Sequence, residues 1–255
     1  MNHRRPLALG LAALAPLALG GCLGVQTTPE KSAAKAKVAS RRLADEQKGQ
    51  TVGKANAKVK VELAAVVQDA NGVAAVVRVK NTGPAQVTLP VGVTVSDAKG
   101  KKLYANDVPG LDPSLTSLSA LRAGEESYWV NNQILVAGKA AKAVAQIGRA
   151  KGKAGATLPK ITLSAIRVGR DQDGVYARGE IRNDSPVAQT RLTVACVAAD
   201  GGKVVAAGRA VVERLPPAAE AKKPTAFTVF FIGDPKGAKL DCSAPPTVLS
   251  GGTSK

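Results

Sequence analysis

Histidine is almost absent from this chain of 255 residues, because its single copy, His3, lies in a segment that the sequence marks for removal. Histidine is the usual general base beside a Ser or Cys nucleophile and a common metal ligand. Without it the chain cannot form a Ser-His or Cys-His pair or a His-ligated metal site. We therefore expect no enzyme, no cofactor and no metal site, although chemistry based on Asp, Glu, Lys or Ser stays formally open.

Aromatic residues and membrane-length apolar runs are also missing. The chain has three Phe, three Tyr and one Trp, and its N-terminal apolar run, Leu7 to Leu19, spans 13 residues. Thirteen residues of helix rise about 20 Å, which is short of the roughly 30 Å hydrocarbon core of a membrane. Since the run follows Arg4 and Arg5, the pattern is typical of a secretory signal peptide and not of a membrane span.

The run ends at Leu19, which is followed by Gly20, Gly21 and Cys22. An aliphatic residue, two small residues and a cysteine in this order resemble the lipobox of bacterial lipoproteins. The resemblance implies that residues 1–21 are a lipoprotein signal peptide, cut before Cys22 after the Cys22 thiol has received a diacylglyceryl group. Acyl chains, at roughly 0.8 kcal/mol per buried CH2, would anchor the protein outside the cytoplasm on the cell membrane or outer membrane. The alternative is ordinary secretion with an incidental cysteine.

The two remaining cysteines, Cys196 and Cys242, form an even pair in a chain expected to be exported. Such a pair predicts a disulfide. Closing a loop of about 46 residues corresponds to roughly 4 kcal/mol of loop-closure entropy. Alternation within two predicted strands allows both sulfurs to point into one core. A redox-active pair is the alternative, but the Cys-x-x-Cys spacing typical of one is missing.

Composition divides the chain after residue 21 into five segments. The first is rich in Ala and Lys, and from residue 59 short β-branched runs alternate with turn residues, which is typical of β-strands. We expect an all-β protein with two tandem immunoglobulin-like β-sandwich domains, each of about seven strands. The predicted segments are a lipidated Cys and flexible basic tether at 22–58, a sandwich at 59–147, a basic Gly/Ala linker at 148–159, a second sandwich at 160–243 and a loose tail at 244–255.

The two predicted sandwiches share an internal repeat with a constant offset of 102 residues. In each copy an Asn-Gly or Asp-Gly hairpin turn precedes a strand, and an Asn-x-x-Pro turn ends that strand. The matched residues are Gly72 with Gly174, Val79 with Ile181, Lys80 with Arg182, Asn81 with Asn183 and Pro84 with Pro186. We interpret this as an internal repeat of one all-β module.

The run from Gly174 to Ser185, followed by the Asp200-Gly201-Gly202-Lys203 turn, resembles a known type of module. It is similar to the immunoglobulin-like modules of the FxLYD type in bacterial envelope proteins. The resemblance covers about a third of the chain. It implies adhesion or assembly and brings no catalytic residues.

Positive charge is concentrated in the segments predicted to be flexible. From Cys22 onward the chain carries 34 basic and 19 acidic side chains, a net charge of +15, of which the tether 23–58 contributes +5 and the linker 148–160 contributes +4. A nucleic-acid reader gathers its charge on a folded face with aromatic platforms. We therefore expect no nucleic-acid partner. A basic tether beside an anionic leaflet is one interpretation, and simple solvation of an unstructured segment is the other.

Two short motifs suggest ligands, and each has a plainer structural interpretation. The run from Asp171 to Gly174 resembles the start of a calcium loop but lacks a third acid and the distant Glu, so a hairpin turn is favoured. Tyr128 and Trp129 would suit stacking on a sugar, but the lone Trp of a sandwich usually lies in the core. We expect Phe227, Phe230 and Phe231 to fill the core of the second sandwich, with Phe227 and Phe231 on one strand face and Phe230 on the opposite face.

These observations favour a non-catalytic membrane-anchored lipoprotein. Its two immunoglobulin-like modules would serve protein–protein interaction or assembly in the cell envelope, with another envelope protein as partner. The alternative is a binding module for an anionic envelope polymer or glycan.

Overall fold

The computed structural model describes residues 49, 51–155 and 157–249. These residues belong to one compact unit, Ala44–Lys255. The predicted signal peptide, the lipobox residues Leu19, Gly20 and Gly21, the modified Cys22 and most of the predicted tether lie outside the described residues. Apart from one short 3-10 turn, the described part of the chain contains only β-strands and loops, which confirms the all-β fold class.

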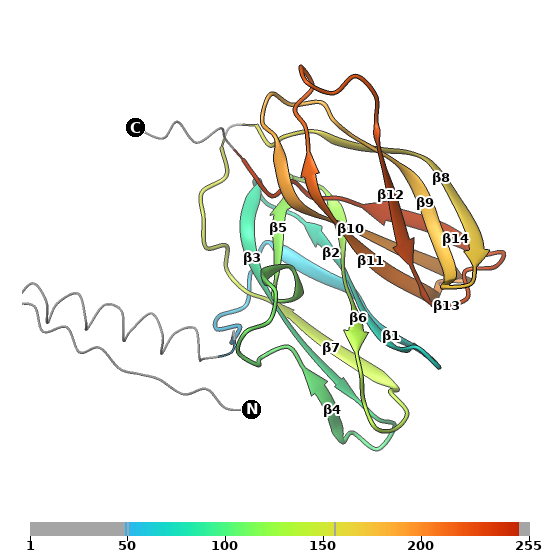
Figure 1. The fold of residues 1–255 in the computed structure, drawn as a ribbon. Helices are drawn as coiled ribbons and strands as arrows, with labels where there is room; N and C mark the ends of the chain where they lie inside the picture. The colour runs from blue at the N-terminus through green and yellow to red at the C-terminus, as the bar shows by residue number, and fades with distance from the viewer. Residues whose placement is uncertain (1–48, 50, 156, 250–255) are drawn as a thin grey trace, which may run out of the picture. The chain divides into compact units, whose positions relative to one another are not determined.

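The first module (residues 59–147) contains seven strands in two sheets (Figure 1). One sheet has the order β1-β2-β6. The other sheet has the order β4-β3-β5, and β7 also pairs with β3. All these pairs are antiparallel. The elements are β1 (Val59–Asp69), β2 (Gly72–Asn81), β3 (Gln86–Ser96), β4 (Lys102–Ala105), the 3-10 turn η1 (Pro113–Leu115), β5 (Ser117–Leu121), β6 (Glu126–Ile134) and β7 (Lys142–Ile147).

The second module (residues 160–243) repeats this plan. Its sheets have the orders β12-β9-β8 and β13-β11-β10-β14. The β8-β9 hairpin corresponds to β1-β2, and the β10-β14 pair corresponds to β3-β7. The elements are β8 (Ile161–Asp171), β9 (Gly174–Asn183), β10 (Gln189–Asp200), β11 (Lys203–Leu215), β12 (Thr225–Phe230), β13 (Ile232–Gly233) and β14 (Lys239–Ser243).

The predicted hairpin turns are present in both copies. Gly72 and Gly174 have φ angles of 140° and 132°, a region that L side chains rarely adopt, so glycine suits both turns. The side chain of Asp171 accepts a hydrogen bond from the backbone of Asp173 at 2.9 Å. Asp69 accepts the equivalent bond from Asn71 at 2.7 Å. The run from Asp171 to Gly174 is therefore a hairpin turn, as the plainer interpretation expects.

Each module encloses its own apolar core, and a third core joins the two modules. Strands β2 and β10 are buried on both faces, as the unbroken buried runs Val73–Val77 and Val194–Ala198 indicate. One face of each strand lines its own sandwich. The other face joins a shared cluster between the β1-β2-β6 sheet and the β10-β11 sheet. The cluster consists of Ala74, Val76, Val130, Ala195, Val197, Val204, Ala207 and Ile232.

The segments predicted to be flexible are partly held against the sandwiches. In the predicted tether, Ala55 forms a bridge with Gly148, and the Asn56 amide donates to the Ile147 carbonyl at 2.9 Å. In the predicted linker, Gly152 forms a bridge with Val87 of β3. The prediction that these stretches are flexible is therefore wrong for the residues named here. Amino-acid composition does not reveal that their backbone pairs with a neighbouring strand.

The first residues of the predicted loose tail are also held. The side-chain amide of Gln189 donates to the Val248 carbonyl at 2.9 Å, and its carbonyl accepts from the amides of Thr247 and Val248. Gln189 is fully buried. The tail therefore runs along β10 as far as the structure describes it, and the prediction of a loose tail is wrong for residues 244–249.

Candidate functional site

A cavity of about 230 Å3 lies at the seam between the two modules. The η1 turn, β5 and β6 line it on one side, and β10, β11 and the segment after β14 line it on the other. Its walls are mostly apolar, with a few Ser and Thr hydroxyls. Ligand sites in proteins are typically concave and apolar with a small number of polar groups. The cavity is therefore the candidate binding site.

A polar network closes one end of the cavity. Asp112 precedes the η1 turn and accepts hydrogen bonds from the Ser114 amide at 2.9 Å and the Ser114 hydroxyl at 2.5 Å. Arg209 donates to the Ser114 hydroxyl at 2.6 Å, and Arg191 forms an ion pair with Asp112. Both arginines come from the second module, so the network ties β10 and β11 to the η1 turn of the first.

The network shifts the pKa values of its members. Burial acts to raise the pKa of Asp112, but the hydrogen bonds from Ser114 and the Arg191 guanidinium outweigh it, so this pKa lies below its usual value. Burial lowers the pKa of Arg209, while Asp112 opposes that effect and Arg191 adds to it. Both groups remain charged near neutral pH. The end of the cavity therefore carries two guanidinium groups and one carboxylate, with Arg191 in an ion pair with Asp112 and Arg209 hydrogen-bonded to the Ser114 hydroxyl.

The Tyr128-Trp129 pair is split between two environments. Trp129 is only 3% exposed, belongs to the core of the first module and donates from Nε1 to the Ser114 carbonyl at 3.0 Å. Tyr128 is half-buried at the seam and lines the cavity. Burial raises the pKa of Tyr128, and the nearby Asp241 carboxylate adds to the rise. The core interpretation therefore holds for Trp129, although both Tyr128 and Trp129 also line the cavity.

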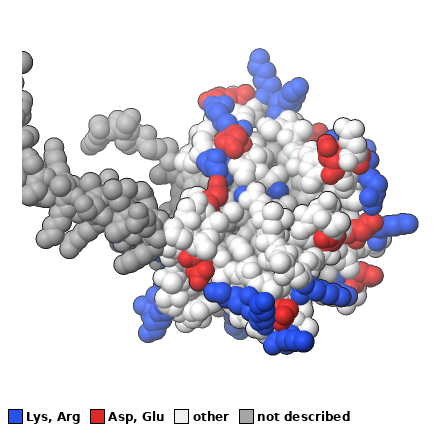
Figure 2. Space-filling view, turned by 60° about the horizontal axis from the view of Figure 1, so that its bottom comes forward, with Lys and Arg blue, Asp and Glu red and all other residues white. Residues whose placement is uncertain are grey.

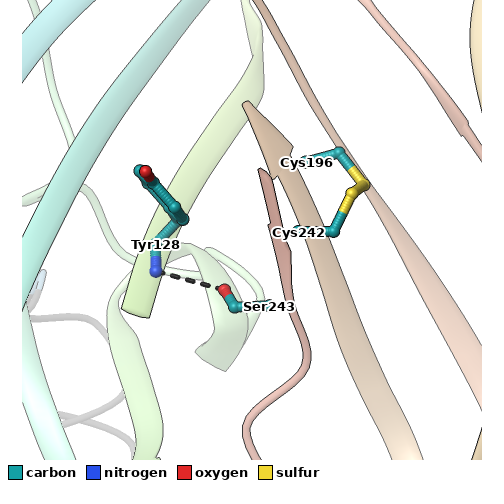
Figure 3. Close-up of a disulfide and its surroundings, with 4 residues drawn as sticks. All are labelled: Tyr128, Cys196, Cys242 and Ser243. Atoms are coloured by element: carbon teal, nitrogen blue, oxygen red, sulfur yellow. Dashed lines mark hydrogen bonds between the residues drawn. A yellow bond between two sulfur atoms is a disulfide. The ribbon is translucent and has the colours of Figure 1, made fainter. Parts of the chain in front are cut away.

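The predicted disulfide between Cys196 and Cys242 is present (Figure 3). It joins directly paired residues of β10 and β14, with a Cα–Cα distance of 4.1 Å. Cys196 is fully buried in the core of the second module, as the alternation of its strand predicts. Beside the disulfide, the Ser243 hydroxyl accepts hydrogen bonds from the Tyr128 amide at 3.1 Å and the Ser127 hydroxyl at 3.2 Å. The disulfide therefore secures the strand that contacts the first module.

The core prediction is confirmed for Phe227 and Phe231 and is wrong for Phe230, because the strand face of Phe230 points away from the second core. Phe227 and Phe231 are buried in the second core, while Phe230 is 38% exposed on the opposite face. In the part of the chain that the structure describes, no three His, Cys, Asp or Glu side chains gather where they could hold a metal ion. Within that same part, no helix is long and apolar enough to cross a membrane.

Sequence reasoning did not find the cavity or its network of Asp112, Ser114, Arg191 and Arg209. These residues come from segments as far as 97 positions apart and carry no shared motif. The available signal was the unbroken apolar run in β2 and β10, since strands buried on both faces need a second layer. That pattern indicates that the modules pack together, but it does not indicate which loops meet at the seam.

The chain matches no protein-family model, and no curated protein matches it.

Proposed function

We propose that this protein is a non-catalytic, lipid-anchored lipoprotein of the bacterial cell envelope that binds another envelope protein through its paired immunoglobulin-like modules. The observation that carries the proposal is the cavity at the seam, an apolar hollow whose walls come from both modules. A pocket of this kind suits an apolar side chain of a partner, because such anchors dominate the energetics of protein interfaces.

Edge strand β5 gives the cavity a second feature of a protein-binding site. Among the strands that the structure describes, β5 pairs with β3 alone, and Ser117, Leu118 and Ser119 of β5 line the cavity. A partner segment that follows such an edge can place one side chain in the neighbouring pocket. The Ser119 hydroxyl also donates to the Pro245 carbonyl at 3.2 Å, which keeps one wall of the cavity in place.

The lipid anchor is part of the same proposal and rests on the lipobox resemblance of residues 19–22. The disulfide between Cys196 and Cys242 supports an extracytoplasmic location, because disulfides persist in oxidising compartments. Mass spectrometry of the native protein should find Cys22 as the first residue with acyl chains attached. An unmodified thiol at Cys22 would contradict the lipid anchor. It would not test the proposed binding of an envelope protein, which has its own experiment.

The binding proposal is tested by filling the cavity. Thr193→Trp places an indole at the cavity wall, and Val144→Trp places the same group on β7, at an exposed residue that does not line the cavity. Crosslinking on intact cells should capture one envelope protein with the unmodified chain and with Val144→Trp. The Thr193→Trp chain should lose that adduct, provided that its thermal midpoint is unchanged. Equal capture by both variants would rule out the cavity as the binding site.

A further inference from the structure

The outer face of the β8-β9-β12 sheet carries an organised set of aromatic and arginine side chains. Strand register places the outward residues in two rows across the three strands. The first row is Gly169, Tyr176 and Phe230, and the second is Arg167, Arg178 and Thr228. The other sheet of this module faces the first module, so the β8 and β9 parts of the rows lie away from the seam. At the β12 end, the Phe230 carbonyl accepts a hydrogen bond from the Asn132 side-chain amide of the first module at 3.4 Å.

The internal repeat shows what the same face does in the first module. There the equivalent positions on β1 and β2 are apolar, and they belong to the cluster shared with the β10-β11 sheet. Three positions differ in character: Ala65 corresponds to Arg167, Ala74 to Tyr176 and Val76 to Arg178. A covered protein interface is depleted of charge at its centre, as in the first module. The arginine-bearing face of the second module is therefore not suited to packing against an apolar sheet.

The pairing of two arginines in the second row is expected to lower the folding stability of the sheet. Arg167 and Arg178 are directly paired across β8 and β9, and like charges in this position repel. A bulge between Ser164 and Arg167, with Ala165 at a φ of 50°, shifts the alternation of β8 and turns Arg167 outward. Within the described residues, neither arginine forms an ion pair. An external anion would relieve this repulsion.

Arg178 is also held in a fixed orientation. Its Nε donates to the Thr228 hydroxyl at 3.2 Å, and its guanidinium carbon lies 4.6 Å from the centre of the Tyr176 ring. The Tyr176 ring lies close over Gly169, where an added Cβ would come within 2.6 Å of it. An arginine fixed in this way loses little side-chain entropy when it binds a planar acid group through its Nη atoms.

Phe230 adds an apolar ring beside the arginines. It packs edge-on against Tyr176, with 5.9 Å between the ring centres, and it is 38% exposed. The other two phenylalanines of the chain are buried. An exposed ring next to a fixed guanidinium matches a ligand that has both an apolar ring face and a negative group.

We propose that this face binds an anionic polysaccharide, with its carboxylates on Arg167 and Arg178 and a sugar ring against Phe230. A flat strip suits a linear polymer that lies across the strands. Glu180 occupies the next outward position on β9 and pairs with Ser164, so it would repel acid groups from that side and direct them to the arginine row. This site goes beyond the proposed protein partner and stands apart from the cavity.

The experiment measures binding of uronic-acid oligomers, such as oligogalacturonate, to the full mature chain in detergent. Arg178→Gln should weaken binding about tenfold or more, since charge-assisted hydrogen bonds are the strong ones. Arg149→Gln, which removes the same charge from the linker, should leave it unchanged. Arg167→Gln should weaken binding while keeping or raising the thermal midpoint, because it removes a like-charge contact. A neutral oligosaccharide should bind no variant.

Three results would overturn the proposal. The first is no binding of uronic-acid oligomers to the unmodified chain, and the second is an equal loss with Arg149→Gln. The third is binding of poly-L-glutamate as tight as that of the oligomer and unaffected by Phe230→Ala, because the ligand would then be an acidic polypeptide. Thr193→Trp, which fills the seam cavity, should bind the oligomer normally, so failure of this site and failure of the proposed protein site are distinguishable.

Discussion

Two buried asparagines explain why the Asn-x-x-Pro turn occurs in both modules. Asn183 donates to the carbonyls of Val187 and Pro216 at 2.8 and 3.1 Å, and its side-chain oxygen accepts from the amide and hydroxyl of Ser185. Asn81 makes the equivalent contacts: it donates to the carbonyls of Pro84 and Arg122 at 2.7 and 2.9 Å and accepts from the Gly83 amide at 3.0 Å. Each amide thus joins the end of a strand to a later turn of its sandwich, which a hydrophobic side chain could not do.

Asn183→Ala should destabilise the protein by about 2–4 kcal/mol, because it leaves several buried backbone groups unpaired. The midpoint and slope of urea unfolding measure this change. Asn71→Ala, at an exposed hairpin turn, is the matched control and should cost less than about 0.5 kcal/mol. A similar loss in both variants would show that turn propensity, and not the buried hydrogen bonds, accounts for the effect.

At the level of elements, β14 connects the disulfide to the seam. Cys242 ties it to β10, and the next residue, Ser243, bonds to Ser127 and Tyr128 of β6. Strand existence and most hairpins follow from the sequence, since alternation and the Asn-Gly and Asp-Gly turns are local signals. The bulges of β1 and β8 do not, because they depend on which residues face the partner strand.

Removing the disulfide with Cys196→Ser and Cys242→Ser together should destabilise the protein by roughly 4 kcal/mol, the loop-closure entropy of a loop of about 46 residues. Without reductant, urea unfolding should show the variant to be less stable than the unmodified chain by this amount. With reductant, the two proteins should have the same stability. Hydrogen exchange should also quicken at the Tyr128 amide, which Ser243 holds. Unchanged exchange there would mean that β14 keeps its place without the crosslink.

On the scale of the whole molecule, four sheets stack, and the two inner sheets share an apolar cluster. Small side chains at Ala74, Ala195 and Ala207 let these sheets approach closely. Asp69 supports the same seam by accepting a hydrogen bond from the Gly233 amide at 2.8 Å. Figure 2 shows a face on which Lys, Arg, Asp and Glu lie mostly around the rim, with largely uncharged residues in the middle.

Because the modules share a core, the unmodified chain should unfold in one calorimetric transition. Ala207→Glu buries a charge in the seam and should separate the modules into two transitions, with the lower one several degrees below the original midpoint. Ala226→Glu, which places the same side chain on an exposed strand position, should keep a single transition. Two transitions in the unmodified chain would show that the seam contributes little to stability.

The all-β class, the two repeated modules, the hairpin turns and the disulfide were predictable from the amino-acid sequence, because each depends on local patterns or on residue counts. The signal peptide, the anchor at Cys22 and the envelope partner remain predictions from sequence. The contacts that hold the described linker and tail residues, and the meeting of Asp112, Ser114, Arg191 and Arg209, are known only from the folded chain. The unbroken apolar runs of β2 and β10 indicate that a second layer covers them, but no local pattern indicates which faces and loops of distant strands meet there.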